Sequence, residues 1–120
     1  MDERTIQGFF RATDDGDFEV LRKHLHPEVI VTMIGVEGVD APFDLSSYLK
    51  FLEENIAGRQ SVGERTEHVP THVKIDGACI AIRGYLRITS PDAADEYHPY
   101  TDILKLRDGR IREYNIAYDI

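Results

Sequence analysis

The sequence contains one cysteine and no long apolar run, and each shortage excludes a class of protein. Cys79 has no partner for a disulfide within the chain, which is typical of proteins in a reducing compartment. No apolar stretch approaches the roughly 20 residues that a membrane-spanning helix needs. The N-terminal residues MDERTIQGFF carry charges of both signs and lack the apolar core of a signal peptide. We therefore expect a cytoplasmic protein with no membrane partner.

Basic residues are also in short supply: 14 Lys and Arg stand against 22 Asp and Glu, which gives a formal net charge of −8. Nucleic-acid binding depends on a clustered basic surface, and the sequence holds no such cluster, so we expect no nucleic-acid partner. The 120 residues are 42% hydrophobic and 30% charged, a composition typical of a folded globular chain. A chain of this length fits one domain, spanning residues 1–120.

Apolar residues recur at helical spacing in three segments, all in the first half of the chain. The first segment runs from Ile6 to Thr13 and is broken by the sequence Asp14-Asp15-Gly16-Asp17. The second runs from about Phe18 to Leu25, with Asp17 as a plausible N-cap and Pro27 as a stop signal. The third starts at Asp44 and ends at Gly58.

The remaining segments have the alternation or the β-branched residues of strands. We predict strands over 28–34, 64–75, 78–89, 96–106 and 110–118, with loops over 35–42 and 90–95 and tight turns at 76–77 and 108–109. The order predicts an α+β fold in which three helices cover a strongly curved, mostly antiparallel sheet. Such a sheet leaves a cone-shaped pocket, and the whole resembles an α+β barrel.

Three sequence markers occur in this same order along the chain. They are Asp14-Asp15-Gly16-Asp17, then Leu25-His26-Pro27-Glu28-Val29, and then Tyr100-Thr101-Asp102 leading into Asp108-Gly109-Arg110-Ile111. Together with the total length, they make the chain resemble the nuclear transport factor 2-like (NTF2-like) superfamily, in particular its SnoaL-like branch. The resemblance implies a homodimer through the outer sheet face, where Arg83, Tyr85 and Arg87 form an unusually bulky row.

His68 and Asp14 are the first candidates for chemistry. In members of the superfamily that resemble scytalone dehydratase and hexachlorocyclohexane dehydrochlorinase, a histidine at the place of His68 is a general base. Its partner there is an aspartate between the first two helices, which Asp14 matches. A carboxylate fixes the tautomer of an imidazole and stabilises its protonated form, which suits proton abstraction. The alternative is that His68 is a half-exposed strand residue and Asp14 only ends a helix, where Asp15 could serve equally well.

Asp102 is the second candidate, on the same strand face as Tyr100. In proteins that resemble ketosteroid isomerase, an aspartate at this place donates a hydrogen bond in its neutral form. An apolar cone raises the pKa of a carboxyl group by desolvation. The equally weighted alternative is that Asp102 pairs with a nearby polar side chain and organises the strand. The isomerase mechanism itself fits poorly, because its base falls at Met33 and its oxyanion tyrosine at Phe9.

The resemblance places a further set of side chains around a cavity. These predicted substrate-binding residues are Phe9, Met33, Phe51, Ile82, Leu86, Tyr100, Tyr114 and Tyr118. Core packing alone is an equally good account of the tyrosines. His72 shares strand parity with His68, and His98 could join them, but this spacing is not a zinc pattern. We therefore predict no metal and no cofactor.

Three functions are compatible with these residues. The first is a cofactor-independent lyase or isomerase with dehydratase- or cyclase-like acid–base chemistry on a small, apolar, ring-bearing molecule. In it His68 removes a proton, Asp14 orients His68, and Asp102 or a tyrosine polarises an oxygen. The second is a binding module of the same fold without chemistry, which Met33 favours. The third is a structural dimer or regulatory subunit whose cavity is closed by aromatic side chains.

Overall fold

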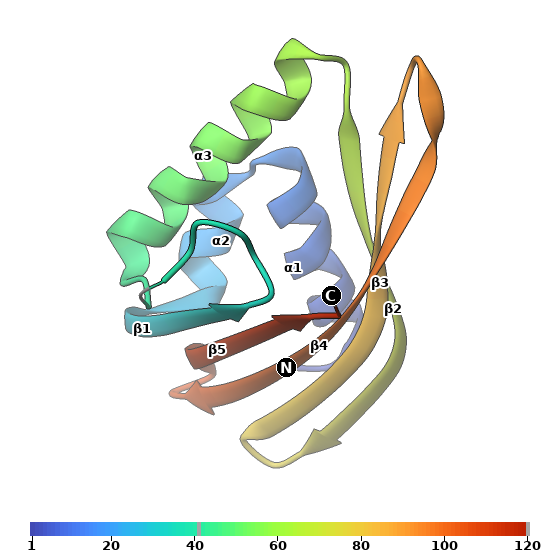
Figure 1. Ribbon diagram of the computed structural model, residues 1–120. Coiled ribbons are helices and arrows are strands. Elements are labelled where there is room, and N and C mark those ends of the chain that lie inside the picture. The colour runs from blue at the N-terminus through green and yellow to red at the C-terminus, as the bar shows by residue number, and fades with distance from the viewer. Residues whose placement is uncertain (41, 120) are drawn as a thin grey trace.

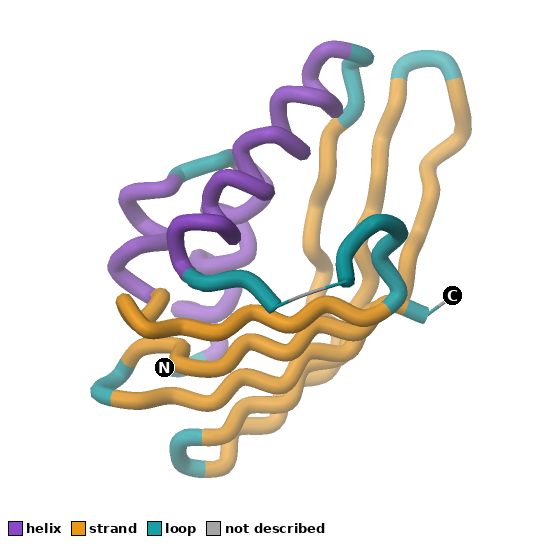
Figure 2. Tube along the Cα trace, turned by 60° about the vertical axis from the view of Figure 1, so that its left-hand side comes forward, coloured by secondary structure: helices purple, strands orange, loops and turns teal. Residues whose placement is uncertain are grey.

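Three helices lie on one face of a single five-stranded sheet in the computed structural model, which describes residues 1–40 and 42–119 (Figures 1 and 2). The helices are α1 (Glu3–Asp15), α2 (Phe18–His24) and α3 (Leu45–Ser61); the strands are β1 (Leu25–Ile34), β2 (Arg65–Asp76), β3 (Cys79–Ser90), β4 (Ala93–Arg107) and β5 (Arg110–Tyr118). The strand order is β1-β5-β4-β3-β2; β1 and β5 pair in parallel, and the other neighbouring strands pair antiparallel. This confirms the predicted α+β class.

The boundaries of the first two helices follow from their caps. Asp2 accepts a hydrogen bond from the Thr5 backbone N–H at 2.8 Å, and Gly16 ends α1 in the left-handed region with a φ of 70°. The predicted cap Asp17 accepts from the Val20 N–H at 3.3 Å and begins α2. The helix ends at His24, ahead of the expected stop at Pro27, because the chain is already extended at the next residue.

The third helix is longer than predicted. Asp44 and Ser47 form a capping box at its start, as the sequence suggests. The expected end at Gly58 is wrong, since the helix continues to Ser61 and a left-handed Gly63 follows with a φ of 74°. A glycine inside an exposed helix costs only about 1 kcal/mol, so it does not by itself end the helix. As a result, α3 extends over the open end of the curved sheet (Figure 1).

The sheet bends where β2 carries an extra residue. Pro70 pairs with Gly84, but His72 pairs with Arg83, so Thr71 forms a bulge. Its hydroxyl donates to the Arg83 carbonyl oxygen at 3.1 Å. The bulge moves His72 to the outer face, so the predicted shared parity of His72 with His68 is wrong.

The connection between β3 and β4 is shorter than predicted. A loop was expected over 90–95, but Ser90 pairs with Ala93, so the turn contains only Pro91 and Asp92. The residues after it extend β4 along β3 as a long hairpin. This places Glu96 and His98 within a paired strand and fixes the face that each side chain occupies.

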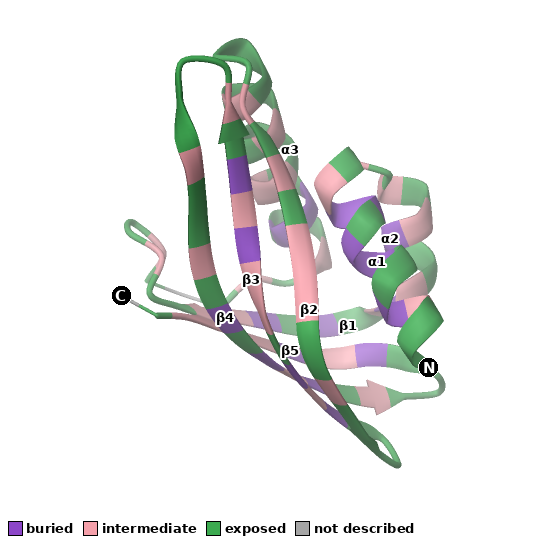
Figure 3. Cartoon of the chain, turned by 90° about the vertical axis from the view of Figure 1, so that its right-hand side faces the viewer, coloured by how far each residue is buried: buried purple, intermediate pink, exposed green. Residues whose placement is uncertain are grey.

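The core lies between the inner sheet face and the helices. Along β3 the predicted inner residues Ile80, Ile82, Leu86 and Ile88 are all buried, and Figure 3 shows the alternation. In residues 1–40 and 42–119, no helix lies on the outer sheet face (Figure 1). Within residues 1–40 and 42–119, no helix combines the length and apolar character needed to cross a bilayer.

Candidate functional site

Asp14, at the end of α1, holds three groups on β2. Its Oδ1 lies 2.7 Å from His68 Nδ1 and accepts from the Thr66 hydroxyl at 2.9 Å. Its Oδ2 accepts from the His68 backbone N–H at 2.8 Å. Because β2 is an edge strand, this N–H has no strand partner, and Asp14 satisfies it. The structure thus selects Asp14 rather than Asp15 as the partner of His68.

This contact orients the imidazole of His68. An ionised carboxylate can only accept, so Nδ1 carries the proton that points at Asp14. The neutral ring then has a lone pair on Nε2, on its opposite side. This is the arrangement in which a carboxylate fixes the tautomer of a histidine base and stabilises the imidazolium that forms.

Two aromatic rings hold His68 in place. The Phe10 ring stacks on the imidazole with centroids 5.0 Å apart and an interplanar angle of 7°. The Tyr100 ring meets it edge-on at 5.6 Å. Phe10 and Asp14 lie at i and i+4 on α1, so one helix face supplies both the stacking ring and the carboxylate. The remaining exposed part of the imidazole is small, since the side chain of His68 is 12% exposed.

Asp102 lies deeper in the cone, on β4 between Ile82 and Ile116 of the neighbouring strands. It is only 1% exposed, its Oδ2 accepts from the Tyr114 hydroxyl at 3.4 Å, and its Oδ1 has no partner. Burial raises the pKa of the Asp102 carboxyl to about 8, and the hydrogen bond from Tyr114 opposes this only in part. At neutral pH, Asp102 is therefore mostly a neutral hydrogen-bond donor.

Two tyrosines, Tyr100 and Tyr118, lie close enough to both carboxyl groups to be affected by their charge. Tyr100 lies on the same strand face as Asp102, and its buried hydroxyl has no hydrogen-bond partner. Burial, the charge of Asp102 and the charge of Asp14 all raise the pKa of Tyr118, in that order. The same causes raise the pKa of Tyr100, so both hydroxyls stay protonated and can donate. Among the described residues, Tyr100 Oη and Asp102 Oδ1 are the two buried side-chain atoms without a partner.

A glycine makes room for the Tyr100 side chain. A Cβ on Gly84 would lie 2.8 Å from Tyr100 Oη and 2.3 Å from the Val69 carbonyl oxygen. Both distances are far below ordinary contact, so only glycine fits at this point of the curved sheet. The position of Tyr100 beside His68 therefore depends on Gly84.

The other predicted lining residues fall into two groups. Phe9 and Ile82 are fully buried, and Phe9 packs edge-on against Tyr114 at 5.6 Å. Met33 is half-buried against the core, and Phe51 stacks on Phe43 at 5.1 Å, next to β1 rather than beside His68. The inner sheet face thus carries His68, Leu86, Tyr100, Asp102, Tyr114 and Tyr118, and Asp14 joins it through its contact with His68. Phe51, on α3, is not part of this face.

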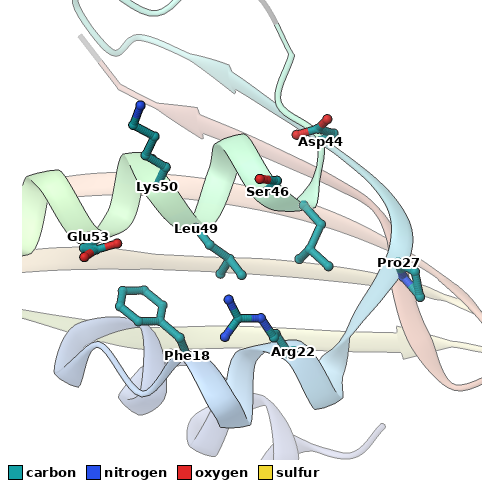
Figure 4. A pocket seen from close by; sticks show the side chains of 9 residues that line it. Phe18, Arg22, Pro27, Asp44, Ser46, Leu49, Lys50 and Glu53 are labelled. Carbon is teal, nitrogen blue, oxygen red and sulfur yellow. The ribbon is translucent and has the colours of Figure 1, made fainter.

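Two surface clefts differ in what they contain. The larger, of about 800 Å³, runs along the β2 edge and includes Asp14 and His68. The smaller, of about 470 Å³, lies between α2 and α3, where Arg22 is directed toward Leu49 and Phe18 (Figure 4). The smaller cleft contains none of the predicted site residues, so the candidate site is the larger one. Tyr100 and Asp102 do not line it and are buried in the core.

The side chains considered as metal ligands do not converge. Over residues 1–40 and 42–119, no group of three His, Cys, Asp or Glu side chains is placed to hold an ion. His72 lies on the outer face, and His98 lies 3.5 Å from Glu96. Cys79 is exposed at the start of β3.

Two members of the site were not predicted. Thr66 shares strand parity with His68, and Phe10 is one helical turn before Asp14, so spacing alone contains a signal for each. Threonine and phenylalanine do not act as acids or bases, so neither residue was singled out. Their contacts, Thr66 with Asp14 and Phe10 with His68, form only when α1 lies against β2.

Comparisons with known proteins add a fold relationship. No protein-family model matches the sequence, and no curated protein does either. IdmH from Streptomyces antibioticus, a proposed polyketide cyclase, has a TM-score of 0.80 at 22% identity, over 97% of this chain and 90% of that chain. A proposed SnoaL-like polyketide cyclase from Jannaschia sp. CCS1 has a TM-score of 0.72 at 18% identity, over 97% and 83%.

An LEH-like epoxide hydrolase from M. tuberculosis also has a TM-score of 0.72, at 15% identity, over 97% of this chain and 80% of that chain. Proteins with different chemistry therefore share this backbone. The chain has the cone-shaped NTF2-like fold, which is the fold that the resemblance in the sequence implies.

Proposed function

We propose that the chain is a cofactor-independent lyase or isomerase that removes a proton from a carbon next to a carbonyl group. The observation that carries the proposal is the 2.7 Å contact between His68 Nδ1 and Asp14 Oδ1, which leaves Nε2 free as a base. A carbon acid needs both a base and a group that stabilises the oxygen of the resulting enolate. Asp102, neutral and without a partner at Oδ1, is the group that donates to this oxygen.

The substrate in this proposal is a small apolar molecule with a ring. Leu86 and Tyr100, which share the inner sheet face with His68 and Asp102, are buried apolar or aromatic side chains. A substrate that reaches Asp102 would therefore contact mainly apolar groups. Polyketide cyclases among the proteins of similar fold support a substrate of this kind. The deprotonated carbon then either expels a leaving group or is protonated at another position.

A binding module without chemistry is the second candidate, and one observation favours it. The unpartnered Tyr100 Oη and Asp102 Oδ1 would be satisfied by the oxygen of a bound ligand, whether or not a proton moves. Met33, at the place of the ketosteroid isomerase base, is consistent with it.

Deuterium exchange separates the two candidates. The probe is 4-phenylbutan-2-one in D2O, whose protons next to the carbonyl are followed by NMR with and without protein. We expect the protein to accelerate exchange and His68→Gln to lower the protein-dependent rate about 100-fold, the usual size of a lost general base. The control His72→Gln, on the outer face, should exchange at the wild-type rate. Binding of the ketone with exchange at the buffer rate would support the binding module and contradict the enzyme.

We also propose a homodimer through the outer sheet face. In the part of the chain that the structure describes, no helix covers this face (Figure 1), and it carries Ile34 and Tyr97, which are 63% and 57% exposed. Two of the three residues predicted to form the bulky outer row already make contacts within the chain: Arg87 pairs with Asp95 at 2.8 Å, and Tyr85 packs against Tyr97. Large exposed apolar groups on an uncovered sheet face favour association with a second copy.

A further inference from the structure

Four arginines line the cleft that contains His68, and each comes from a different element. They are Arg11 on α1, Arg59 on α3, Arg65 on β2 and Arg87 on β3. The chain as a whole carries a net charge of −8, so it repels anions at long range. An uncharged ketone needs no cation in this cleft, whereas an anionic ligand needs cations close to it.

Two of the four arginines are unsuited to hold a ligand beside the imidazole. Arg87 Nη2 lies 2.8 Å from Asp95 Oδ2, and its Nε donates to the same oxygen at 3.0 Å, so its guanidinium is already engaged. Arg65 lies three residues before His68 on β2, so the alternation of the strand points its side chain to the outer sheet face. Arg11 and Arg59 are the two that remain.

Arg11 and Arg59 have guanidinium groups that can take a ligand. Among residues 1–40 and 42–119, Arg11 is in no ion pair, although Asp15 follows it by one helical turn. Arg59 lies near Glu64, but at 3.9 Å the contact is too long for a hydrogen bond. Both arginines can therefore donate to an anion without breaking a hydrogen-bonded ion pair of the chain.

The positions of the two arginines relate them to His68. Arg11 is three residues before Asp14 on α1, so the two side chains are neighbours on one helix face, and Asp14 contacts the imidazole at 2.7 Å. Burial and nearby carboxylates raise the pKa of Tyr118, and the charge of Arg59 opposes them, so Arg59 lies close to the inner sheet face. A ligand held by these arginines therefore has its other end within reach of His68.

The anion that suits this cleft is a carboxylate. The guanidinium fork binds the paired oxygens of a carboxylate or a phosphate through parallel hydrogen bonds. Asp14, Asp15 and Glu64 line the same cleft, and their negative charges oppose a doubly charged phosphate more than a singly charged carboxylate. The sequence also has no glycine-rich phosphate loop.

We propose that Arg11 and Arg59 bind a carboxylate on the substrate and make the cleft selective for a ring-bearing keto acid over a neutral ketone. The inference rests on the proposed function and names its substrate class. The carboxylate lies at the arginines, and the carbon next to the ketone lies at His68 Nε2. Because the carboxylate is remote from the reacting carbon, its binding adds affinity and fixes the position of that carbon.

The test compares two probes of the same shape and different charge. They are 4-(3-oxobutyl)benzoate and 4-(3-oxobutyl)benzamide, and NMR titration of the protein gives the dissociation constant of each. We expect wild type to bind the benzoate at least about tenfold more tightly, as charge-assisted hydrogen bonds do, and high salt to reduce this preference.

Substitutions then assign the preference to the two arginines. The double variant Arg11→Gln, Arg59→Gln should bind the benzoate only as tightly as the benzamide, and each single variant should lose part of the preference. Binding of the benzamide within about twofold of wild type shows that the variant is folded. The control Arg83→Gln removes the same charge from the outer face, outside the cleft, and should keep the preference.

Deuterium exchange next to the ketone, followed in the same samples, separates this inference from the proposed function. Equal affinity of wild type for the two probes, binding of neither probe, or a preference that persists in the double variant would overturn the role of the arginines at any exchange rate. A preference that depends on the arginines, without accelerated exchange, would support the carboxylate site and contradict the enzyme. The two failures are therefore distinguishable.

Discussion

Replacing Asp102 with asparagine should remove a pH dependence of folding stability. The pKa of the buried Asp102 carboxyl is raised from 3.8 to about 8. The native state therefore holds a proton that the unfolded chain releases between these two values. The stability that this proton contributes is fully present below about pH 4 and is lost as the pH rises through 8.

The magnitude follows from the size of the shift. Each pH unit within the window changes the free energy of unfolding by about 1.4 kcal/mol for one proton. Between pH 5 and pH 8 the wild-type protein should thus lose about 3–4 kcal/mol through Asp102. An asparagine side chain does not titrate, so Asp102→Asn should lack this loss and should gain stability relative to wild type as the pH rises.

Urea unfolding at a series of pH values measures this difference. Protein concentration must be held fixed, because a dimer links stability to concentration. Asp92→Asn, at the exposed tip of the β3–β4 hairpin, is the matched control and should keep the wild-type slope. Parallel stability curves for Asp102→Asn and wild type would show that Asp102 does not titrate with a raised pKa, and would remove the neutral donor from the site.

Three further predictions concern other parts of the site. Asp14→Ala should lower the free energy of unfolding by about 2–4 kcal/mol in urea titrations, because three donors on β2 lose their acceptor, whereas the exposed Asp15→Ala should have little effect. Gly84→Ala should lower the free energy of unfolding, measured in thermal melts, by about 2 kcal/mol or more, and should reduce the catalysis of deuterium exchange because it displaces Tyr100. Gly8→Ala, which has open space around it, should leave the stability in these melts unchanged or raise it. Light scattering should give a mass of twice 13.7 kDa for wild type and a lower mass for Tyr97→Lys; a monomeric wild type would refute the dimer.

Spacing alone predicted much of the fold. Helical and strand periodicity placed all three helices and the five strands, and the caps Asp17 and Asp44 were correct, because these signals depend on neighbours in the sequence. The errors arose where a local signal was overridden. Gly58 lies inside α3, and the loop expected after Ser90 is a two-residue turn.

The candidate site was less accessible to sequence reasoning. The pairing of His68 with Asp14 was anticipated from the family resemblance, not from spacing, because the two residues are 54 positions apart. The bulge at Thr71 could not be read from strand alternation, and it moved His72 to the outer face. The predicted loop over 90–95 contains the real turn but is too long, so the register that pairs His98 with Leu86 emerged only from the structure.

The tautomer of His68 tests the central claim without any substrate. Long-range proton–nitrogen NMR of the imidazole, in mildly alkaline buffer, distinguishes a protonated from an unprotonated ring nitrogen. The account predicts that Nδ1 carries the proton, hydrogen-bonded to Asp14, that Nε2 is bare, and that Asp14→Ala alters this pattern. A proton on Nε2 in the wild-type protein would mean that the base is blocked, and would contradict the account.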